Sequence, residues 1–442
     1  MTIRMDEGAA ELLDTLHRAG YAAYVVGGCV RDSLMGLTPH DWDLCTSALP
    51  QQGMELFGAE KCIPTGLQHG TVTVKQGGGL YEITTFRTEG AYTDGRHPDE
   101  VHFVPDVRED LARRDFTINA MAYNEKEGLV DPFGGQTDLQ SGVLRAVGLP
   151  RQRFTEDALR ILRLYRFAAR FGFAIDPPTA QAAQELCAHL DCVSVERIEE
   201  ELAKLLSAPA PAAYLNEKIL SVVLPELSPE ALAAAKPVVD ACPAGERALP
   251  VRLAALLLSL GEDGTRRTLR RLRCSNACIE ETAVLVREVV SGVPGAFSSD
   301  TNRAIPSPAL LPAATGSHPS GRSSEKLPAR PPVSLNIYTR KLLGQYGLKT
   351  VQRLAALGTA LQPEHAADFA AFSELAEQLD ADGVCCRVSQ LAVNGRDLMA
   401  AGVPAGPGIR KVLEALLDGV IREEYPNERQ ALLAAVQQLA AS

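Results

Sequence analysis

The sequence predicts a multidomain protein in which an N-terminal α/β unit is followed by all-helical segments, and three observations carry this prediction. The chain has 442 residues, too many for one ordinary hydrophobic core, so about two to four domains are expected. Strand-like runs and glycine turns are confined to about residues 1–150, and apolar residues beyond them recur at helical spacing. Eight prolines among many Ser, Ala and Gly residues at 291–333 indicate a flexible insert or linker before a last helical segment.

The N-terminal unit has the patterning of an α/β or α+β fold, in which short helices and glycine turns connect the strands. Alternating or short continuous apolar runs predict strands at four places: Ala22–Val26, Thr71–Lys75, Tyr81–Phe86 and Val101–Val104. The first of these strands is the one that leads into the most informative motif of the chain.

Gly27 and Gly28 follow the first predicted strand and form a turn before a short helix, which is expected at Val30–Met35 with Gly36 ending it. The backbone of such a turn can approach a ligand closely. The helix N-terminus behind it presents free N–H groups and a positive dipole end, which together suit a triphosphate.

Asp41 and Asp43 come next and are two residues apart, so on a strand both carboxylates project from one face. Two such carboxylates can hold Mg²⁺ against phosphates, as two-metal phosphoryl or nucleotidyl transfer requires. Glu82, in the strand predicted at Tyr81–Phe86, could add a third carboxylate, although a solvated strand glutamate fits the pattern equally well. A glycine turn followed by solvated acids is the alternative for the whole motif, and the joint spacing speaks against it.

From about residue 150 the pattern turns helical, with helices predicted at Glu156–Phe171, Pro178–His189, Val195–Leu206, Arg252–Leu260 and Ile279–Val290. Along the first of them a charged residue recurs every third position: Asp157, Arg160, Arg163 and Arg166. An i,i+3 ion pair with a solvated basic face would explain this polar stripe without a ligand. The other interpretation is base recognition by protein. A carboxylate can accept from the exocyclic amine of adenine or cytosine and a guanidinium can donate to the neighbouring ring nitrogen, whereas uracil and guanine present the reverse pattern of donors and acceptors.

These motifs resemble those of the nucleotidyltransferase superfamily that contains the class II tRNA nucleotidyltransferases and the bacterial poly(A) polymerases. The pattern GG-x-VRD-x-L-x-G-x4-D-x-D-x2-T runs from Gly27 to Thr46. Three further stretches follow in the family's order: Arg113–Ala120, Asp131–Gly135 and Glu156–Arg163. The resemblance is strong over about residues 20–205, weaker to 290, and returns near 388–436, where the chain is similar to the tail of bacterial tRNA nucleotidyltransferases.

The resemblance implies a head with a mixed sheet over residues 1–150 and a helical neck for base recognition over 151–206. It implies a helical body over 207–290, the flexible insert over 291–335, and a helical tRNA-binding tail over 336–442. Asp41 and Asp43 would be the catalytic metal ligands and Mg²⁺ the cofactor. The substrates would be CTP, ATP and tRNA, the last bound by its 3′ end and its elbow.

The resemblance also assigns the nucleotide contacts. Gly28 and Arg31 would bind the triphosphate; the alternative for Arg31 is an ion pair with Asp32 or with an acid at the sheet edge. The ribose would be read by three residues: Arg114, Asp115 and Asn119. Structural capping by Asp115 and Asn119 is the alternative there. Asp157 and Arg160 would accept ATP and CTP and refuse UTP and GTP, with Arg163 and Arg166 completing the set.

The activity implied is template-independent addition of C, C and A to tRNA 3′ ends, with release of pyrophosphate. An A-adding or CC-adding relative or a poly(A) polymerase is the alternative, and an inactive RNA-binding protein is a remote one. Asp94 and Arg96 resemble the flexible loop of enzymes that add the final A, an ordinary surface turn being the other interpretation. Leu258–Ser259 stands where some relatives carry His-Asp, so no phosphohydrolase activity is expected.

The composition of the chain limits the classes of protein to which it can belong. With 46% hydrophobic and 22% charged residues the chain is typical of a soluble globular protein. The longest apolar run, Leu253–Leu258, is too short to span a bilayer, and the N-terminus has no apolar signal segment, so the cytoplasm is expected and no membrane contact. Ten scattered cysteines without zinc spacing indicate free thiols. The net charge of −11 argues against nucleic-acid binding, whereas arginine-rich stretches at 145–170 and 266–273 favour it. No obligate protein partner is inferred.

Overall fold

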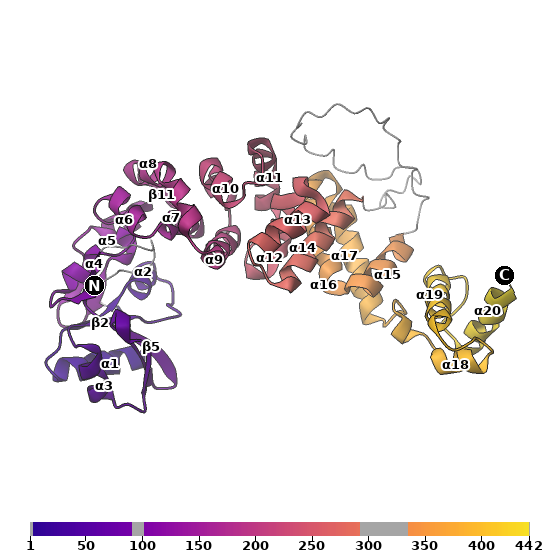
Figure 1. The fold of residues 1–442 in the computed structure, drawn as a ribbon, viewed down its shortest axis with the longest axis horizontal. Coiled ribbons are helices and arrows are strands. Elements are labelled where there is room, and N and C mark those ends of the chain that lie inside the picture. The colour runs from indigo at the N-terminus through magenta and orange to yellow at the C-terminus, as the bar shows by residue number, and fades with distance from the viewer. Residues whose placement is uncertain (1–2, 91–100, 292–334, 442) are drawn as a thin grey trace. The chain divides into compact units, whose positions relative to one another are not determined.

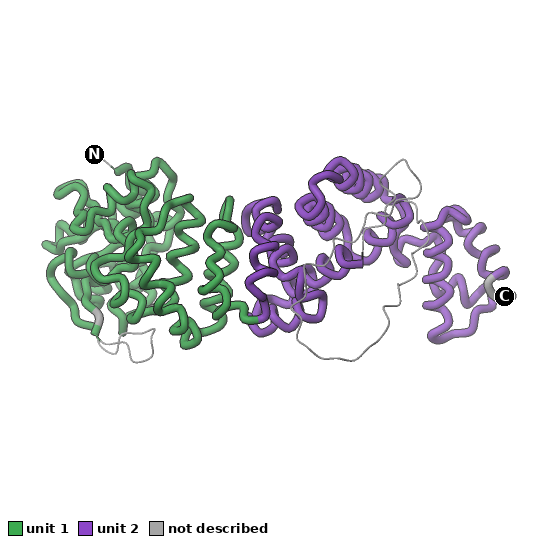
Figure 2. The backbone as a smooth tube through the Cα atoms, turned by 90° about the horizontal axis from the view of Figure 1, so that it is seen from above, with its two compact units in different colours: residues 1–225 green, residues 226–442 purple. Residues whose placement is uncertain are grey.

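The computed structural model describes residues 3–90, 101–291 and 335–441. They form two compact units, residues Met1–Pro225 and Glu226–Ser442 (Figure 2). The boundary between the units therefore falls inside the segment predicted as the body. The segment with Asp94 and Arg96, and the predicted insert apart from its two end residues, lie outside the described residues.

The centre of the first unit is a seven-stranded mixed sheet with the strand order β3-β4-β5-β2-β1-β8-β9. Its strands are β1 (Ala23–Val26), β2 (Leu44–Thr46), β3 (Cys62–Gly66), β4 (Thr71–Gln76), β5 (Gly79–Thr85), β8 (Ala122–Asn124) and β9 (Gly128–Val130). β2 and β5 run parallel, with Leu44 beside Ile83, and the other neighbouring strands of this sheet are antiparallel. The mixed sheet implied by the resemblance is confirmed.

Two small sheets accompany the large one. β6 (Arg87–Glu89) pairs antiparallel with β7 (Val101–Phe103), and β10 (Val143–Leu144) pairs parallel with β11 (Ala174–Ile175). The strand predicted at Val101–Val104 is therefore present but lies outside the main sheet.

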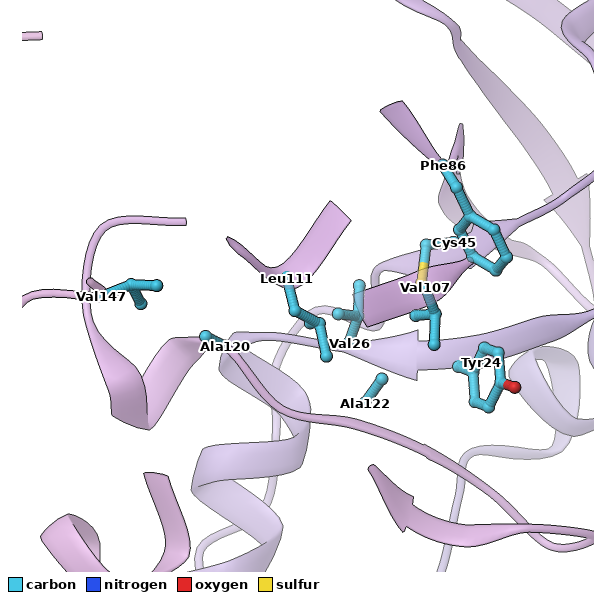
Figure 3. Packing of buried hydrophobic residues seen from close by; sticks show 9 residues of the cluster. All are labelled: Tyr24, Val26, Cys45, Phe86, Val107, Leu111, Ala120, Ala122 and Val147. Carbon is cyan, nitrogen blue, oxygen red and sulfur yellow. The ribbon is translucent and has the colours of Figure 1, made fainter. Parts of the chain in front are cut away.

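A hydrophobic core forms where alternate residues of the central strands meet helix α4 (Val107–Ala112). Tyr24 and Val26 of β1 and Cys45 of β2 pack in one buried cluster with Val107 and Leu111 (Figure 3). Because strand side chains alternate between faces, the side of the sheet that carries Cys45 is also the side of Asp43 and Asp41. The core thus fixes α4 beside the ends of β1 and β2.

The other helices of the first unit are α1 (Glu7–Arg18), α2 (Gly28–Leu34), α3 (Pro50–Phe57), α5 (Gly135–Ser141), α6 (Pro150–Glu156), α7 (Leu159–Phe171), α8 (Pro177–Glu185), α9 (Val195–Leu206) and α10 (Glu217–Val223). The described residues of the second unit are helical (Figure 1): α11 (Pro229–Ala241), α12 (Leu249–Leu257), α13 (Gly261–Arg271), α14 (Asn276–Val290), α15 (Leu335–Tyr346), α16 (Leu348–Leu361), α17 (Ala366–Ala381), α18 (Gly395–Ala400), α19 (Pro407–Ile421) and α20 (Arg429–Ala441). Among the described residues, no helix combines the length and apolar character that crossing a bilayer requires.

The helix predicted at Val195–Leu206 is confirmed with those bounds as α9. The continuous helix predicted at Glu156–Phe171 is wrong at its start, because α6 ends at Glu156 and α7 begins at Leu159. Asp157 has an extended backbone (φ −142°, ψ 104°), and its Oδ1 accepts a hydrogen bond from Leu159 N at 3.0 Å. This local side-chain contact competes with helix continuation and starts α7 afresh.

Candidate active site

The glycine turn at the end of β1 depends on the backbone conformation of Gly27, and an arginine side chain lies close to it. Gly27 has φ +79° and ψ −122°, a backbone that favours glycine, and its N–H donates to Met121 O at 3.0 Å. A Cβ at this position would lie 2.9 Å from Arg114 Nη1. Gly28 then begins α2, and a Cβ there would lie 3.6 Å from Arg31 Nη2. Two guanidinium groups therefore lie against this turn.

Asp41 and Asp43 lie immediately before β2 rather than within it, and Val26 N donates to Asp43 O at 2.9 Å. This bond continues the pairing of β2 with β1 by one residue. Asp41 and Asp43 are exposed and Trp42 between them is buried. This alternation is that of an extended chain, so both carboxylates point to the same solvent-facing side.

Glu82 is an exposed residue of β5, the parallel neighbour of β2. The register that sets Leu44 beside Ile83 brings Asp43 beside Glu82 when it is continued by one residue. Although the Asp43 side chain reaches solvent, nearby protein atoms displace part of its hydration, and this loss of hydration raises its pKa; Arg114 acts in the opposite direction, and the negative charges of Glu82 and Asp41 add to the increase. The three carboxylates therefore share one electrostatic environment.

The donors around Asp43 are carboxylate oxygens, the ligands that hard divalent cations prefer. Within residues 3–90, 101–291 and 335–441, no group of three or more His, Cys, Asp or Glu side chains is drawn together as closely as metal ligands are. The pKa of Asp43 is raised mainly by loss of hydration, and the negative charges of Glu82 and Asp41 add to this effect. A divalent cation would offset both effects by favouring the ionised carboxylates, so the chemistry of these residues fits such an ion.

Arg31 is almost fully buried, with 4% of its surface exposed. Its Nε donates to Asp32 Oδ1 at 2.8 Å and its Nη1 to Asn119 Oδ1 at 2.5 Å. The guanidinium also lies over two rings of α7, 5.4 Å from the centre of Phe167 and 4.9 Å from that of Phe171. The pairing with Asp32 that the sequence left open is thus present, and Arg31 joins α2 to α7.

Asp110 in α4, which sequence reasoning missed, is fully buried and gathers two successive arginines. Its Oδ1 accepts from Arg113 Nε at 3.0 Å and Nη2 at 2.8 Å, and its Oδ2 from Arg114 Nη2 at 3.4 Å. Burial alone would raise the pKa of Asp110, but Arg113 and Arg114 outweigh it and the pKa is lowered. Arg114 Nε is buried without a hydrogen-bond partner among the described residues, so it has a donor to offer a ligand.

Asp115 and Asn119 are both buried and lie together. Asp115 Oδ2 accepts from Arg163 Nε at 2.9 Å and Nη2 at 2.7 Å, and its Oδ1 accepts from Asn119 Nδ2 at 3.2 Å. Burial opposes ionisation of Asp115, but Arg163 outweighs it and lowers the pKa to about 2. Oδ1 also accepts from Phe116 N at 2.8 Å, so the structural alternative of local backbone contacts is present for Asp115.

Asp157 and Arg160 each have an ion-pair partner other than one another. Asp157 Oδ2 accepts from Arg197 Nη2 of α9 at 2.8 Å. Arg160 Nη1 donates to Glu156 Oε2 at 2.6 Å, and its Nη2 donates to the carbonyl of Arg113 at 3.0 Å. Asp157 lies between α6 and α7, and Arg160 lies in the first turn of α7 against the end of α4.

Arg163 and Arg166 have different surroundings although they are three residues apart. The Arg163 side chain is 33% exposed and binds Asp115. Arg166 is buried, with its guanidinium 3.8 Å from the centre of Phe167 and its Nε 2.5 Å from Glu201 Oε2 of α9. Arg166 is therefore not part of a solvated basic face of α7, which was one of the two interpretations of the sequence.

The structure thus brings most of the predicted residues into one region between the ends of β1 and β2, the end of α4 and the start of α7. Asp94 and Arg96 fall outside the described residues. Sequence reasoning missed the acids that hold the arginines in place, Asp110, Glu156 and Glu201, and the partner of Asp157, Arg197. The i,i+4 spacing of Arg197 and Glu201 on a predicted helix was the available signal for two of them.

Family models match three parts of the chain: the poly A polymerase head domain at 23–145, the RNA and SrmB-binding site of polymerase A at 172–230, and tRNA nucleotidyltransferase domain 2 at 337–436. The chain is 34% identical to a CCA-adding enzyme of Lactiplantibacillus plantarum, over 97% of this chain and 95% of that protein. It is 36% identical to the CCA-adding enzyme of Limosilactobacillus fermentum, over 98% and 97% of the two chains.

Solved structures give the same result. The Bacillus stearothermophilus CCA-adding enzyme in complex with CTP matches with a TM-score of 0.77 and 30% identity, over 99% of this chain and 98% of that one. The Thermotoga maritima CCA-adding enzyme, complexed with tRNA, matches in fold with a TM-score of 0.62 and 21% identity, over 98% and 94% of the two chains.

Proposed function

The chain belongs to the CCA-adding enzymes, a family of tRNA nucleotidyltransferases, and on that premise we propose that it adds C, C and A to tRNA 3′ ends from CTP and ATP without a nucleic-acid template. The observation that carries the chemistry is the pair of exposed carboxylates, Asp41 and Asp43, beside the Gly27 turn. A carboxylate pair next to a close-approach turn can place a cation and a triphosphate side by side.

The metal in this proposal is Mg²⁺, held by Asp41 and Asp43 with Glu82 as a further carboxylate. When bound, the ion makes the primer 3′-hydroxyl more acidic and neutralises charge on the triphosphate. In the reaction, a bond forms between the 3′-oxygen and the α-phosphorus, the bond to pyrophosphate breaks, and the hydroxyl proton is released. Asp41 and Asp43 therefore orient the reacting groups and form no covalent bond with them.

The triphosphate end of the nucleotide would lie against the Gly27–Gly28 turn. Gly28 allows the close approach, and the positive charges of Arg31 and Arg114 lie beside it. Arg114 has a buried Nε with no hydrogen-bond partner among the described residues, and this donor supports a role toward phosphate or ribose. Asp115 and Asn119 would complete ribose recognition, while Arg163 holds the Asp115 carboxylate.

The base would be read by Asp157 and Arg160. The Asp157 carboxylate keeps free lone pairs after accepting from Leu159 N and Arg197, so it can accept from the exocyclic amine of cytosine or adenine. Arg160 would donate to cytosine N3 or adenine N1. Uracil and guanine present a carbonyl to Asp157 and an N–H to Arg160, and both contacts would be unfavourable. Arg166 supports the site by packing α7 onto α9.

The domain proposal keeps the head at 1–150, the neck at 151–206, the body at 207–290 and the tRNA-binding tail at 336–442, with Asp94 and Arg96 in a loop of the head. The protein is proposed to act in the cytoplasm. All ten cysteines lie in the described part of the chain and are free thiols, as is typical of a reducing compartment.

The test incubates purified protein and Mg²⁺ with four tRNAs, which end without any of the CCA sequence, with C, with CC or with CCA. CTP, ATP or both are added, and product length is read on a gel. Growth that stops at CCA from every shorter end is expected. Termination at CC would indicate a CC-adding enzyme, action on the CC end alone an A-adding enzyme, and unlimited addition of A a poly(A) polymerase. The absence of any extension would overturn the proposal.

A matched pair of variants tests the carboxylates in the same assay. Asp41→Asn should lower the extension rate by on the order of a thousandfold, since a metal contact of this kind supplies several kcal/mol to the transition state. Binding of tRNA should be retained. Asp14→Asn, which removes an exposed carboxylate of α1, is the control and should leave extension unchanged.

A further inference from the structure

Asp110 is a carboxylate with no surface exposed, on the last turn of α4. Fully buried acids are rare unless paired, and this one accepts from both Arg113 and Arg114. It also accepts from the backbone N–H of Arg87 at 3.3 Å, the first residue of β6. One buried carboxylate thus joins the end of α4, the next two arginines of the chain and a neighbouring strand.

The end of α4 is also where the head meets the neck. The carbonyl of Ala112 accepts from Arg153 Nη1 at 2.9 Å, and the carbonyl of Arg113 accepts from Arg160 Nη2 at 3.0 Å. Guanidinium groups at the carboxyl end of a helix are favoured by the partial negative charge there. Arg160 therefore takes part of its position from the backbone of Arg113, whose own side chain is fixed by Asp110 at two nitrogens.

We infer that Asp110 is a positioning residue for nucleotide selection, acting through Arg113 on Arg160 and through Arg114 on the triphosphate end. This inference rests on the proposed function, in which Arg160 reads the base. Asp110 itself touches no substrate: it is buried behind the two arginines, with its side chain wholly covered.

The geometry explains why the charge of Asp110 matters for position. Arg113 and Arg114 are consecutive, so their side chains leave the backbone in different directions, and both return to one carboxylate. Asn at this position keeps the size of the side chain but loses the negative charge and one acceptor oxygen, and its amide would face a guanidinium. The Arg113 carbonyl would then be free to move away from Arg160.

The experiment measures kcat/KM for CTP, ATP, UTP and GTP on tRNA, and equilibrium Kd values for CTP and UTP without tRNA. Asp110→Asn should reduce the preference for CTP over UTP by about tenfold to a hundredfold, because a displacement of about 1 Å in a positioned group costs about that much. Asp106→Asn is the control. Asp106 caps the same helix by accepting from Arg108 N at 2.9 Å, and Asn can keep this cap, so the variant removes one carboxylate charge from the start of α4 without touching Arg113 or Arg114. Its nucleotide preference should be unchanged.

A double-mutant cycle with Arg160→Ala tests the route of the effect. If Asp110 acts through Arg160, the double variant should discriminate CTP from UTP no worse than Arg160→Ala alone. Two results would overturn the inference while leaving the proposed function intact. One is that the two variants lose preference for CTP additively; the other is that Asp110→Asn keeps the preference while Arg160→Ala loses it. If Arg160→Ala keeps full preference, base reading by Arg160 fails and the inference falls with it.

A second variant tests the inference if Asp110→Asn does not fold. Arg113→Lys keeps the positive charge and the backbone carbonyl but loses the two-nitrogen contact with Asp110. A smaller loss of preference in the same direction is expected, and full preference in a folded Arg113→Lys protein would count against the inference.

Discussion

Single charged residues in this site are held by partners distant in the sequence. Asp115 and Arg163 are 48 residues apart and make two hydrogen bonds to one carboxylate oxygen, with Asp115 only 8% exposed. Arg163 is 33% exposed, so water screens part of the attraction, but its loss would leave the Asp115 carboxylate without its guanidinium partner. The pair therefore connects α7 to the segment that follows α4 while it positions Asp115.

The low pKa of Asp115 makes this contribution dependent on pH. The pKa falls from 3.8 to about 2 on folding, so the contribution is fully present above about pH 4 and is lost as the pH falls through 2. Wild type and Asp115→Asn should differ by about 2 kcal/mol more at pH 7 than below pH 2. Urea unfolding followed by the fluorescence of Trp42, the single tryptophan, measures this in the first unit. A difference that stays constant down to pH 2 would contradict the assignment.

At this scale the sequence allowed part of the site to be predicted. Asp41 and Asp43 follow from a two-residue spacing, which chain geometry converts directly into a shared side. For Arg31 the sequence offered the pairing with Asp32, but not the contact with Asn119, 88 residues away, or the rings of α7 beneath the guanidinium. Asp110 did carry a local signal, its i,i+3 and i,i+4 spacing from Arg113 and Arg114, but that spacing does not predict its full burial or its contact with the backbone of Arg87.

At the scale of elements, the junction of α6 and α7 shows how one side chain divides an apolar pattern. The helical spacing of apolar residues continues across Asp157, so periodicity alone favoured one helix. The bond from Leu159 N to Asp157 Oδ1 sets the start of α7 and turns the carboxylate toward Arg197. The break therefore gives Asp157 a position that a residue within a continuous helix would not have.

Helix packing in the second unit depends on a missing side chain. Gly358 lies in α16, and a Cβ there would overlap the ring of Phe369 in α17. Gly358→Ala should therefore destabilise the protein by about 1–3 kcal/mol despite the better helix propensity of alanine. Gly53 in α3 is the matched control, because nothing lies within 4 Å of its Cβ position. Gly53→Ala should gain up to about 1 kcal/mol. Thermal unfolding followed by circular dichroism distinguishes the two, and equal shifts would contradict this packing argument.

At the scale of the whole molecule, the division into an α/β part and a helical part was predictable, but the division into units was not. Strands and helices differ in the period of their apolar residues, so the end of the sheet region is visible in the sequence. Helices on the two sides of Pro225 share one period, so nothing local marks the boundary at Glu226. For the arginine-rich stretch 266–273, the sequence likewise did not show which arginines form ion pairs and which are exposed; the structure shows this.

Because the net charge of the chain is −11, contacts to RNA phosphates would have to come from local groups of exposed arginines, and α13 carries one such group. Arg266 pairs with Glu262 and Glu280 and Arg271 pairs with Glu226, whereas Arg267 and Arg270 are exposed. If these two contact phosphates, the Arg267→Ala/Arg270→Ala double variant should reduce the slope of log K against log salt for tRNA binding by about 1–2, through fewer released counterions.

The control for this prediction is Arg18→Ala/Arg108→Ala, which changes the net charge equally but removes exposed arginines already near acids in the first unit. Filter binding of tRNA from about 50 to 300 mM salt measures both slopes. A smaller slope in the α13 variant alone would mean that local contacts bind the RNA. Equal changes in the two double variants would assign the effect to net charge and remove α13 from the tRNA surface. CTP affinity should stay unchanged in both variants, because neither pair of arginines belongs to the proposed nucleotide site.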